Sequence, residues 1–217
     1  GISTCLECFM VIPPPPVPFT PEVEILDFST RLYRVHHNRH HGAEFNPGVG
    51  SPSRFAFVVG KGGRKVPSLY AAQSQDAAVA ETILHDIPVS GGIIPHDKYA
   101  PVVMSRLSVI KSLRLAVFHG LGLRQLGVTA QELSDSSAST YPMTLPWAQA
   151  AYDSGLAGCV WMSRLCNNAK AYVLFGDRCA GALRVDPSFA RMFATGSDLA
   201  WLIDLCAPLN IDVLPPR

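Results

Sequence analysis

The chain has 217 residues, 48% of them hydrophobic, and its 18 basic and 17 acidic residues give a net charge of +1 at pH 7. This length suits a single domain with one sizeable hydrophobic core. The near-neutral charge argues against a protein that binds nucleic acid or anionic membranes, because such proteins typically carry a basic excess. No segment approaches the ~20 consecutive apolar residues of a membrane span. We therefore expect no direct nucleic-acid partner and no membrane insertion.

The cysteines are too scattered for a disulfide scaffold in a chain of this length. They are Cys5, Cys8, Cys159, Cys166, Cys179 and Cys206. Cys159 and Cys206 lie within apolar runs, as reduced cysteines in a protein core do. Residues 1–10 contain no basic segment followed by a long apolar stretch, so no secretory signal is visible. These features predict a cytoplasmic protein.

Proline dominates the first part of the chain. The segment Val11–Pro18 reads Val-Ile-Pro-Pro-Pro-Pro-Val-Pro and is expected to be extended and peripheral. We therefore divide the chain into a Pro-rich N-terminal extension, residues 1–27, and one domain, residues 28–217.

Three short strands are predicted before the first helix. Apolar and polar residues alternate in Arg31–Val35, whereas Arg54–Val59 and Val66–Ala72 are mainly apolar runs between loop segments. Between the last two, Gly60–Gly63 is typical of a hairpin turn. It is not a phosphate-binding P-loop, because the Lys-Ser/Thr ending and the following helix are missing.

A helix is predicted over Gln75–Asp86, with Ser74 as its N-cap and Pro88 beyond its end. Its alanine, valine, isoleucine and leucine residues form one wide apolar stripe. Glu81 falls at the edge of this stripe, and His85 follows one turn later. A carboxylate at the border of a buried face is unusual and marks a candidate functional residue.

After Pro101 short strands alternate irregularly with a few helices. The predicted strands are 113–118, 158–162, 171–175 and 211–214, and the predicted helices are 146–154 and 197–206. No internal repeat is visible. This pattern favours a single α+β domain over a doubly wound parallel sheet.

Two arginines, Arg34 and Arg54, lie within predicted strands. Burying a guanidinium is costly unless something anionic satisfies its five donors. Two such groups on neighbouring strands can clamp a phosphate or pyrophosphate. The alternative is that each arginine pairs with a surface carboxylate and is only structural.

Histidines and a CxxC pair raise the question of a metal site. Cys5 and Cys8 have no second pair at conventional spacing, and the four histidines of one loop are expected to be solvated. These histidines are His36, His37, His40 and His41. We therefore predict no metal site, and whether these histidines bind anything stays open.

Several segments in order along the chain resemble the RES domain family, named for its arginine, glutamate and serine. The segments are Leu32-Tyr-Arg-Val-His36, Ser53-Arg-Phe55, Leu69-Tyr-Ala71, Ala80-Glu-Thr82, Trp161-Met-Ser-Arg164, Gly122–Gly127, Tyr141…Trp147-Ala148 and Tyr172–Phe175. The resemblance covers roughly residues 32–214. It implies an ADP-ribosyltransferase-like fold, with split sheets and flanking helices.

The resemblance also implies an activity. Characterised family members are toxins that destroy NAD⁺, with phosphate or water as the acceptor, and many are paired with an antitoxin that carries an Xre-type helix-turn-helix. We therefore expect an NAD⁺ phosphorylase or NAD⁺ glycohydrolase. NAD⁺ would be a substrate rather than a cofactor, and inorganic phosphate a candidate co-substrate. Whether the protein forms a homo-oligomer stays open.

The resemblance assigns the chemistry to Glu81, Arg34 and Arg54. Cleaving the bond between ribose C1′ and nicotinamide builds positive charge on the sugar, which a nearby carboxylate stabilises. Glu81 is the candidate for this role, and it would also hold a ribose hydroxyl. Arg34 and Arg54 would grip the pyrophosphate.

Three further residues complete the predicted site. Tyr70 offers a ring that can stack on nicotinamide, although filling the core is an alternative role for it. Ser163 would bond the ribose or a phosphate, since no neighbouring base would make it a nucleophile. His36 directly follows the arginine motif and is expected at the mouth of the pocket.

Alternatives exist for the leading residue and for the function. Glu81 can instead be a surface residue paired with His85 at i+4. The protein can be a mono-ADP-ribosyltransferase acting on a protein target. It can also be a non-catalytic module that binds a nucleotide or a partner, because a fold does not fix a function.

Overall fold

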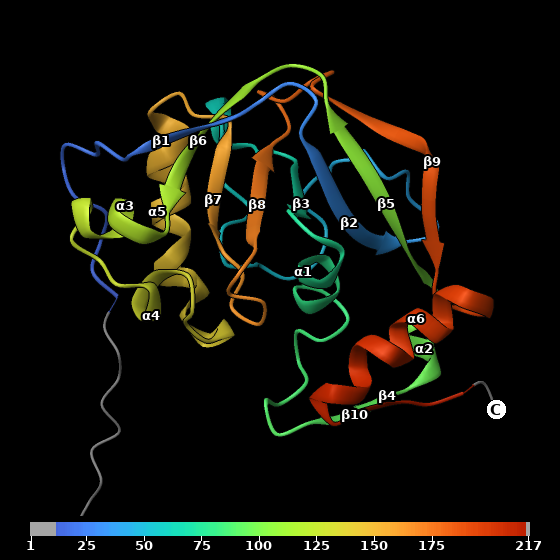
Figure 1. The fold of residues 1–217 in the computed structure, drawn as a ribbon. Coiled ribbons are helices and arrows are strands. Elements are labelled where there is room, and N and C mark those ends of the chain that lie inside the picture. The colour runs from blue at the N-terminus through green and yellow to red at the C-terminus, as the bar shows by residue number, and fades with distance from the viewer. Residues whose placement is uncertain (1–11, 216–217) are drawn as a thin grey trace, which may run out of the picture.

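The computed structural model describes residues 12–215, so Cys5 and Cys8 lie outside the described residues. The chain forms a single α+β domain, which confirms the predicted fold class (Figure 1). Within residues 12–215 no helix is long and apolar enough to cross a membrane.

Most strands belong to one curled, eight-stranded sheet. They are β1 (Val23–Leu26), β2 (Arg31–His37), β3 (Ser68–Ala72), β5 (Val102–Val109), β6 (Leu113–Phe118), β7 (Gly158–Met162), β8 (Lys170–Phe175) and β9 (Leu183–Met192). Their order is β1-β6-β7-β8-β3-β2-β5-β9. Strand β1 lies within the residues expected to form the extension and pairs antiparallel with β6 along its whole length.

The sheet is nearly divided between β2 and β3. These strands share a single residue pair, Tyr33 with Ala72, whereas all of β2 pairs with β5. Figure 1 shows β2, β5 and β9 turning away from the other strands at this point. The narrow join agrees with the split sheets that the resemblance implies, and it leaves room for a cavity between the two halves.

Helices cover two regions of the sheet. The parallel strands β6 and β7 require a crossover, which α3 (Gly120–Gln125), α4 (Ala130–Leu133) and α5 (Tyr141–Asp153) supply. At the other end lie α6 (Gly196–Cys206), α2 (His96–Tyr99) and a parallel pair formed by β4 (Gly92–Ile94) and β10 (Ile211–Val213). Short 3₁₀ turns complete the fold: η1 (Lys61–Gly63), η2 (Ala138–Thr140) and η3 (Ala207–Leu209).

Aromatic residues form the centre of the core that lies between α5 and the strands. Trp147 of α5 is fully buried, and its ring meets that of Phe118 edge to face, with 6.3 Å between the ring centroids. Phe55 packs on Trp161 of β7 with 5.0 Å between centroids. Aromatic side chains bury large apolar areas, so this core fixes the wall that carries Trp161.

Helix α1 (Gln75–Ala80) begins as predicted, because the hydroxyl of Ser74 accepts the backbone N–H of Ala77 at 3.2 Å. It ends six residues before the predicted Asp86. The hydroxyl of Thr82 donates to the carbonyl of Ala78 at 2.6 Å, and such side-chain bonds compete with helical backbone bonds. Glu81 therefore stands at the end of the helix rather than within it.

The segment Arg54–Val59 is not a strand, so that prediction is wrong. Its buried residues resemble a strand in sequence, but side chains take several of the backbone bonds that a neighbouring strand would make. The N–H of Phe55 donates to the hydroxyl of Tyr70 at 3.1 Å, and the N–H of Val59 donates to Oε1 of Gln149 at 2.8 Å. The glycine turn after it is a 3₁₀ turn closed by a bridge between Val59 and Lys65, as a hairpin turn should be.

Candidate active site

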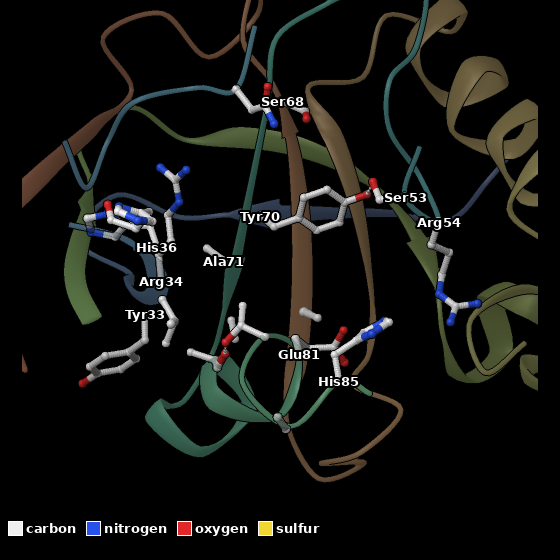
Figure 2. A pocket seen from close by; sticks show the side chains of 18 of the residues that line it. Tyr33, Arg34, His36, Ser53, Arg54, Ser68, Tyr70, Ala71, Glu81 and His85 are labelled. Atoms are coloured by element: carbon white, nitrogen blue, oxygen red, sulfur yellow. Dashed lines mark hydrogen bonds between the residues drawn. The ribbon is translucent and has the colours of Figure 1, made fainter. Parts of the chain in front are cut away.

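A cavity of about 700 Å³ opens where the sheet divides, between β2, β3 and the end of α1. Five predicted site residues line it: Arg34, His36, Arg54, Tyr70 and Glu81. They come from segments that are distant in sequence, and Figure 2 shows them arranged around one hollow. The sequence-based set thus converges in space, with Ser163 as the exception described below.

Glu81 stands on the cavity wall formed by the end of α1. The alanines and valine of the helix before it are buried, which anchors the turn that presents the carboxylate. Its Oε1 accepts the backbone N–H of Arg164 at 3.2 Å. This bond holds the carboxylate at the cavity, and its donor is an uncharged backbone group that does not neutralise the charge. A group that stabilises a developing cation must be fixed in this way.

Arg34 of β2 brings a positive charge to the cavity. Its Nη1 donates to the backbone carbonyls of Gly42 at 2.8 Å and Glu44 at 2.6 Å. Burial lowers the pKa of Arg34 to about 10, an effect that the charge of Glu44 partly opposes. Carbonyls fix the guanidinium but carry no net charge, so an anion in the cavity would be a favourable partner.

In Figure 2, Tyr70 lies between Arg34 and Arg54. It is buried, its Nη1 donates to the carbonyl of Leu133 at 3.2 Å and to Oγ of Ser136 at 2.7 Å, and its Nη2 donates to the carbonyl of Ser136 at 2.7 Å. Burial lowers its pKa. Three of the five N–H groups of Arg54 are thus used to hold Leu133 and Ser136. This anchoring points to a structural role for Arg54 in addition to its place on the cavity wall.

Tyr70 lines the cavity with its ring and secures a loop with its hydroxyl. The hydroxyl shares a hydrogen bond of 2.8 Å with Oγ of Ser53 and accepts the N–H of Phe55 at 3.1 Å. Its ring meets Trp161 edge to face, with 6.0 Å between centroids, and burial raises its pKa. Tyr70 therefore combines the core role and the cavity-lining position that were expected as alternatives.

His36 lies next to Arg34 on the cavity wall, with both ring nitrogens engaged. Nδ1 contacts the carbonyl of His37 at 3.0 Å, and Nε2 contacts Oγ of Ser105 at 2.8 Å. Because a carbonyl only accepts, Nδ1 carries the hydrogen and Nε2 accepts from the serine. Burial lowers the pKa of His36, which favours the neutral ring.

Ser163 follows β7 and does not line the cavity. It is 1% exposed, and within residues 12–215 its hydroxyl has no hydrogen-bond partner. The adjacent Arg164 does line the cavity and pairs with Asp135 at 3.2 Å. Ser163 is thus buried beneath the residues that line the cavity. It could contact a substrate only if these residues moved.

Among the cavity residues without a role assigned from the sequence are His85 and Tyr141. His85 does not pair with Glu81, the alternative raised by their i,i+4 spacing. Its ring nitrogens instead contact Asp86 at 2.8 Å and the hydroxyl of Tyr141 at 3.3 Å. The Tyr141…Trp147 motif pointed to this part of the chain, but only the folded structure brings Tyr141 to His85.

The histidine loop after β2 was considered for metal binding. His40 contacts Glu44 at 3.0 Å through Nδ1, and His37 contacts Arg39. Within the described part of the chain, no group of three or more histidine, cysteine, aspartate or glutamate side chains is arranged to hold a metal ion.

Comparisons with known proteins agree on the fold. The chain matches a chain of the MbcT–MbcA toxin–antitoxin complex of M. tuberculosis, with a TM-score of 0.52 and 13% sequence identity over 76% of this chain and 85% of that chain. At this identity the likeness concerns the fold alone. A search among curated protein sequences finds no match. The family model of the RES domain matches residues 31–196, and the chain therefore belongs to the RES domain family.

Proposed function

We propose that this protein cleaves the bond between nicotinamide and ribose in NAD⁺ and transfers the ADP-ribosyl group to phosphate or water. The observation that carries the proposal is the convergence of Glu81 and Arg34 on one cavity of about 700 Å³ in a chain of the RES family. A volume of this size suits a ligand that fills a deep cleft.

Each charge has a part in the proposed reaction. Nicotinamide leaves as a neutral molecule because its nitrogen already bears a positive charge in NAD⁺, so no general acid is needed. Positive charge then develops on the ribose, and the fixed carboxylate of Glu81 stabilises it. Arg34, whose anchors are uncharged carbonyls, attracts the pyrophosphate or an attacking phosphate.

The other cavity residues shape the site. The ring of Tyr70 is positioned to contact a planar ligand, and His36 lies beside Arg34 at the division of the sheet. Three N–H groups of Arg54 bond Leu133 and Ser136, in and after α4. We place its contribution in holding the cavity wall in place.

The biological role that we propose is that of a toxin, acting on NAD⁺ in the cytoplasm. The solved structure with the similar fold is a toxin–antitoxin complex, and the family resemblance links RES proteins to antitoxins of the Xre type. By this likeness, an antitoxin would bind the chain and block its activity. Growth arrest on expression of the chain alone, relieved by co-expression of such a partner, is the expected result.

Product analysis tests the chemistry. Purified protein is incubated with NAD⁺, with and without inorganic phosphate, and the products are separated. ADP-ribose-1″-phosphate identifies a phosphorylase, and ADP-ribose identifies a glycohydrolase. Modified protein without either product identifies a transferase, and unchanged NAD⁺ in every arm identifies a binding module; either outcome rejects the proposal. Glu81→Gln, purified in parallel, reports whether the activity belongs to this cavity, and Asp97→Asn on the distant α2 is the control.

A further inference from the structure

Tyr141, His85 and Asp86 form a hydrogen-bonded series, of which Tyr141 and His85 line the cavity and Asp86 lies outside it. Nδ1 of His85 lies 2.8 Å from Oδ1 of Asp86, and Nε2 lies 3.3 Å from the hydroxyl of Tyr141. Because an ionised carboxylate only accepts, Nδ1 carries the hydrogen and Nε2 presents its lone pair to the tyrosine hydroxyl. A neutral imidazole held in this tautomer can accept a proton at Nε2.

The imidazole and the proposed catalytic carboxylate share one wall. Glu81 ends α1, His85 follows four residues later, and both line the cavity. Figure 2 shows both side chains rising from this part of the chain. In the proposed reaction the ribose lies beside Glu81, which brings C1′ to the wall that also carries His85.

The other cavity histidines are placed differently. His36, like His85, has a hydroxyl at Nε2, but this hydroxyl belongs to Ser105, which does not line the cavity, whereas Tyr141 does. His37 also lines the cavity, but both its ring nitrogens contact Arg39. The nearest rival is His40, since its Nδ1 also contacts a carboxylate, that of Glu44, at 3.0 Å. It belongs to the loop after β2, however, and not to the wall of Glu81. His85 and His40 both contact a carboxylate, but only His85 lies on the wall that carries Glu81.

We propose that His85 is the general base that activates water in this cavity, which makes it the residue that sets the share of hydrolysis. The inference rests on the proposed function. As the bond from C1′ to nicotinamide breaks, its electron pair leaves with nicotinamide. The water oxygen bonds to C1′, the hydroxyl oxygen of Tyr141 takes the proton of the water, and the proton of that hydroxyl passes to Nε2 of His85. Asp86, a positioning residue, stabilises the imidazolium until the proton passes to solvent.

Phosphate as the acceptor has no need of this base. Hydrogen phosphate is already an anion near neutral pH and attacks C1′ through an oxygen without losing a proton. Loss of His85 should therefore slow the formation of ADP-ribose but not that of ADP-ribose-1″-phosphate. The ratio of the two products is the appropriate readout, because a general structural defect would lower both rates together.

The experiment compares His85→Gln with His40→Gln, the cavity histidine on the other wall, in reactions that contain NAD⁺ and inorganic phosphate. For His85→Gln we expect ADP-ribose formation to fall about 100-fold, with phosphorolysis changed less than about threefold, in line with the usual weight of a general base. His40→Gln should leave the product ratio unchanged. Asp86→Asn removes an exposed carboxylate, so the variant protein should fold normally. It should shift the product ratio in the same direction as His85→Gln, by a smaller factor.

Three results would overturn the inference while leaving the proposed function intact. The first is an unchanged ratio in His85→Gln and Asp86→Asn, and the second is a shift in His40→Gln instead. The third is a wild-type protein that forms no ADP-ribose even without phosphate. A wild-type protein that cleaves no NAD⁺ at all refutes the proposed function, and the inference with it.

Discussion

The backbone N–H of Arg164, just after β7, donates to Oε1 of Glu81 at the end of α1, at 3.2 Å. This bond joins two segments that are 83 residues apart and holds the carboxylate at the cavity. Because the donor is a backbone group, the position of the carboxylate depends on the fold and not on the side chain of Arg164. A substitution that removes the charge of Glu81 but keeps an oxygen to accept this bond can therefore test the charge without moving the side chain.

Glu81→Gln should lower NAD⁺ cleavage by about 100- to 1000-fold, the usual effect of removing one preorganised electrostatic group. The amide oxygen of glutamine can still accept the N–H of Arg164, so the thermal unfolding temperature should stay near that of the wild type. Nicotinamide release is measured by chromatography, and unfolding by circular dichroism. Near-full activity in the folded variant would contradict the role given to Glu81.

Arg54→Ala should destabilise the protein by about 2–4 kcal/mol, because buried carbonyls of Leu133 and Ser136 lose their charged donor. Urea unfolding measures this change in free energy. Proteolysis between α4 and α5 should also become faster, since Arg54 anchors this segment. Arg64→Ala in the exposed glycine turn is the matched control and should change stability by less than about 0.5 kcal/mol.

A different result for Arg54 would be equally informative. If Arg54→Ala kept the stability of the wild type but lost affinity for NAD⁺, the guanidinium would serve the substrate rather than the wall. The phosphate clamp of the sequence-based hypothesis would then be restored.

The strands and the site differ in how far sequence could predict them. Alternation and apolar runs located β2, β3, β6, β7 and β8, because each pairs along a regular ladder. The buried run at 54–59 misled the prediction, since Tyr70 and Gln149 bond its backbone in place of a neighbouring strand. No local pattern encodes such long-range side-chain partners.

The same limit applies to the cavity. Of the six residues selected with the family motifs, five line the cavity and Ser163 does not. The motifs could not reveal which hydrogen bonds each residue would make. Arg54 finds its partners 79 to 82 residues away, and His85 contacts Tyr141, 56 residues away. The motifs therefore pointed to the residues around the cavity, whereas the hydrogen bonds of each residue depend on the tertiary fold.

Acidification should destabilise the protein in part through His36. Burial lowers the pKa of His36 below its ordinary value of 6.5, so the unfolded chain takes up a proton at a higher pH than the folded protein does. Stability must then fall as the pH drops through 6.5 towards the folded-state pKa. Urea unfolding at about pH 7.5 and about pH 5.5 measures this slope.

The variant His36→Gln should reduce the slope of stability against pH, because it removes the group that titrates differently in the two states. His96→Gln on α2 is the control, because His96 is not among the groups that act on His36, and it should retain the wild-type slope. An unchanged slope in His36→Gln would mean that burial does not keep this ring neutral.

Removal of residues 1–20 should destabilise the core around α5. The indole N–H of Trp147, which is fully buried, donates to the carbonyl of Pro13 at 2.9 Å. Phe19 packs edge to face on Trp147 with 6.5 Å between centroids, and the carbonyl of Thr20 accepts a bond from Gln125 at 2.8 Å. An unpaired buried donor and the lost aromatic contact together should cost about 2–4 kcal/mol.

Two measurements check this prediction. The unfolding temperature of the shortened chain should fall, and its tryptophan emission should shift to longer wavelength as water reaches Trp147. A chain that begins at Ile12 is the matched control, because it keeps every contact just named. If the chain without residues 1–20 unfolded at the wild-type temperature, the contacts of Pro13 and Phe19 would be incidental, and the core beneath α5 would be complete without them.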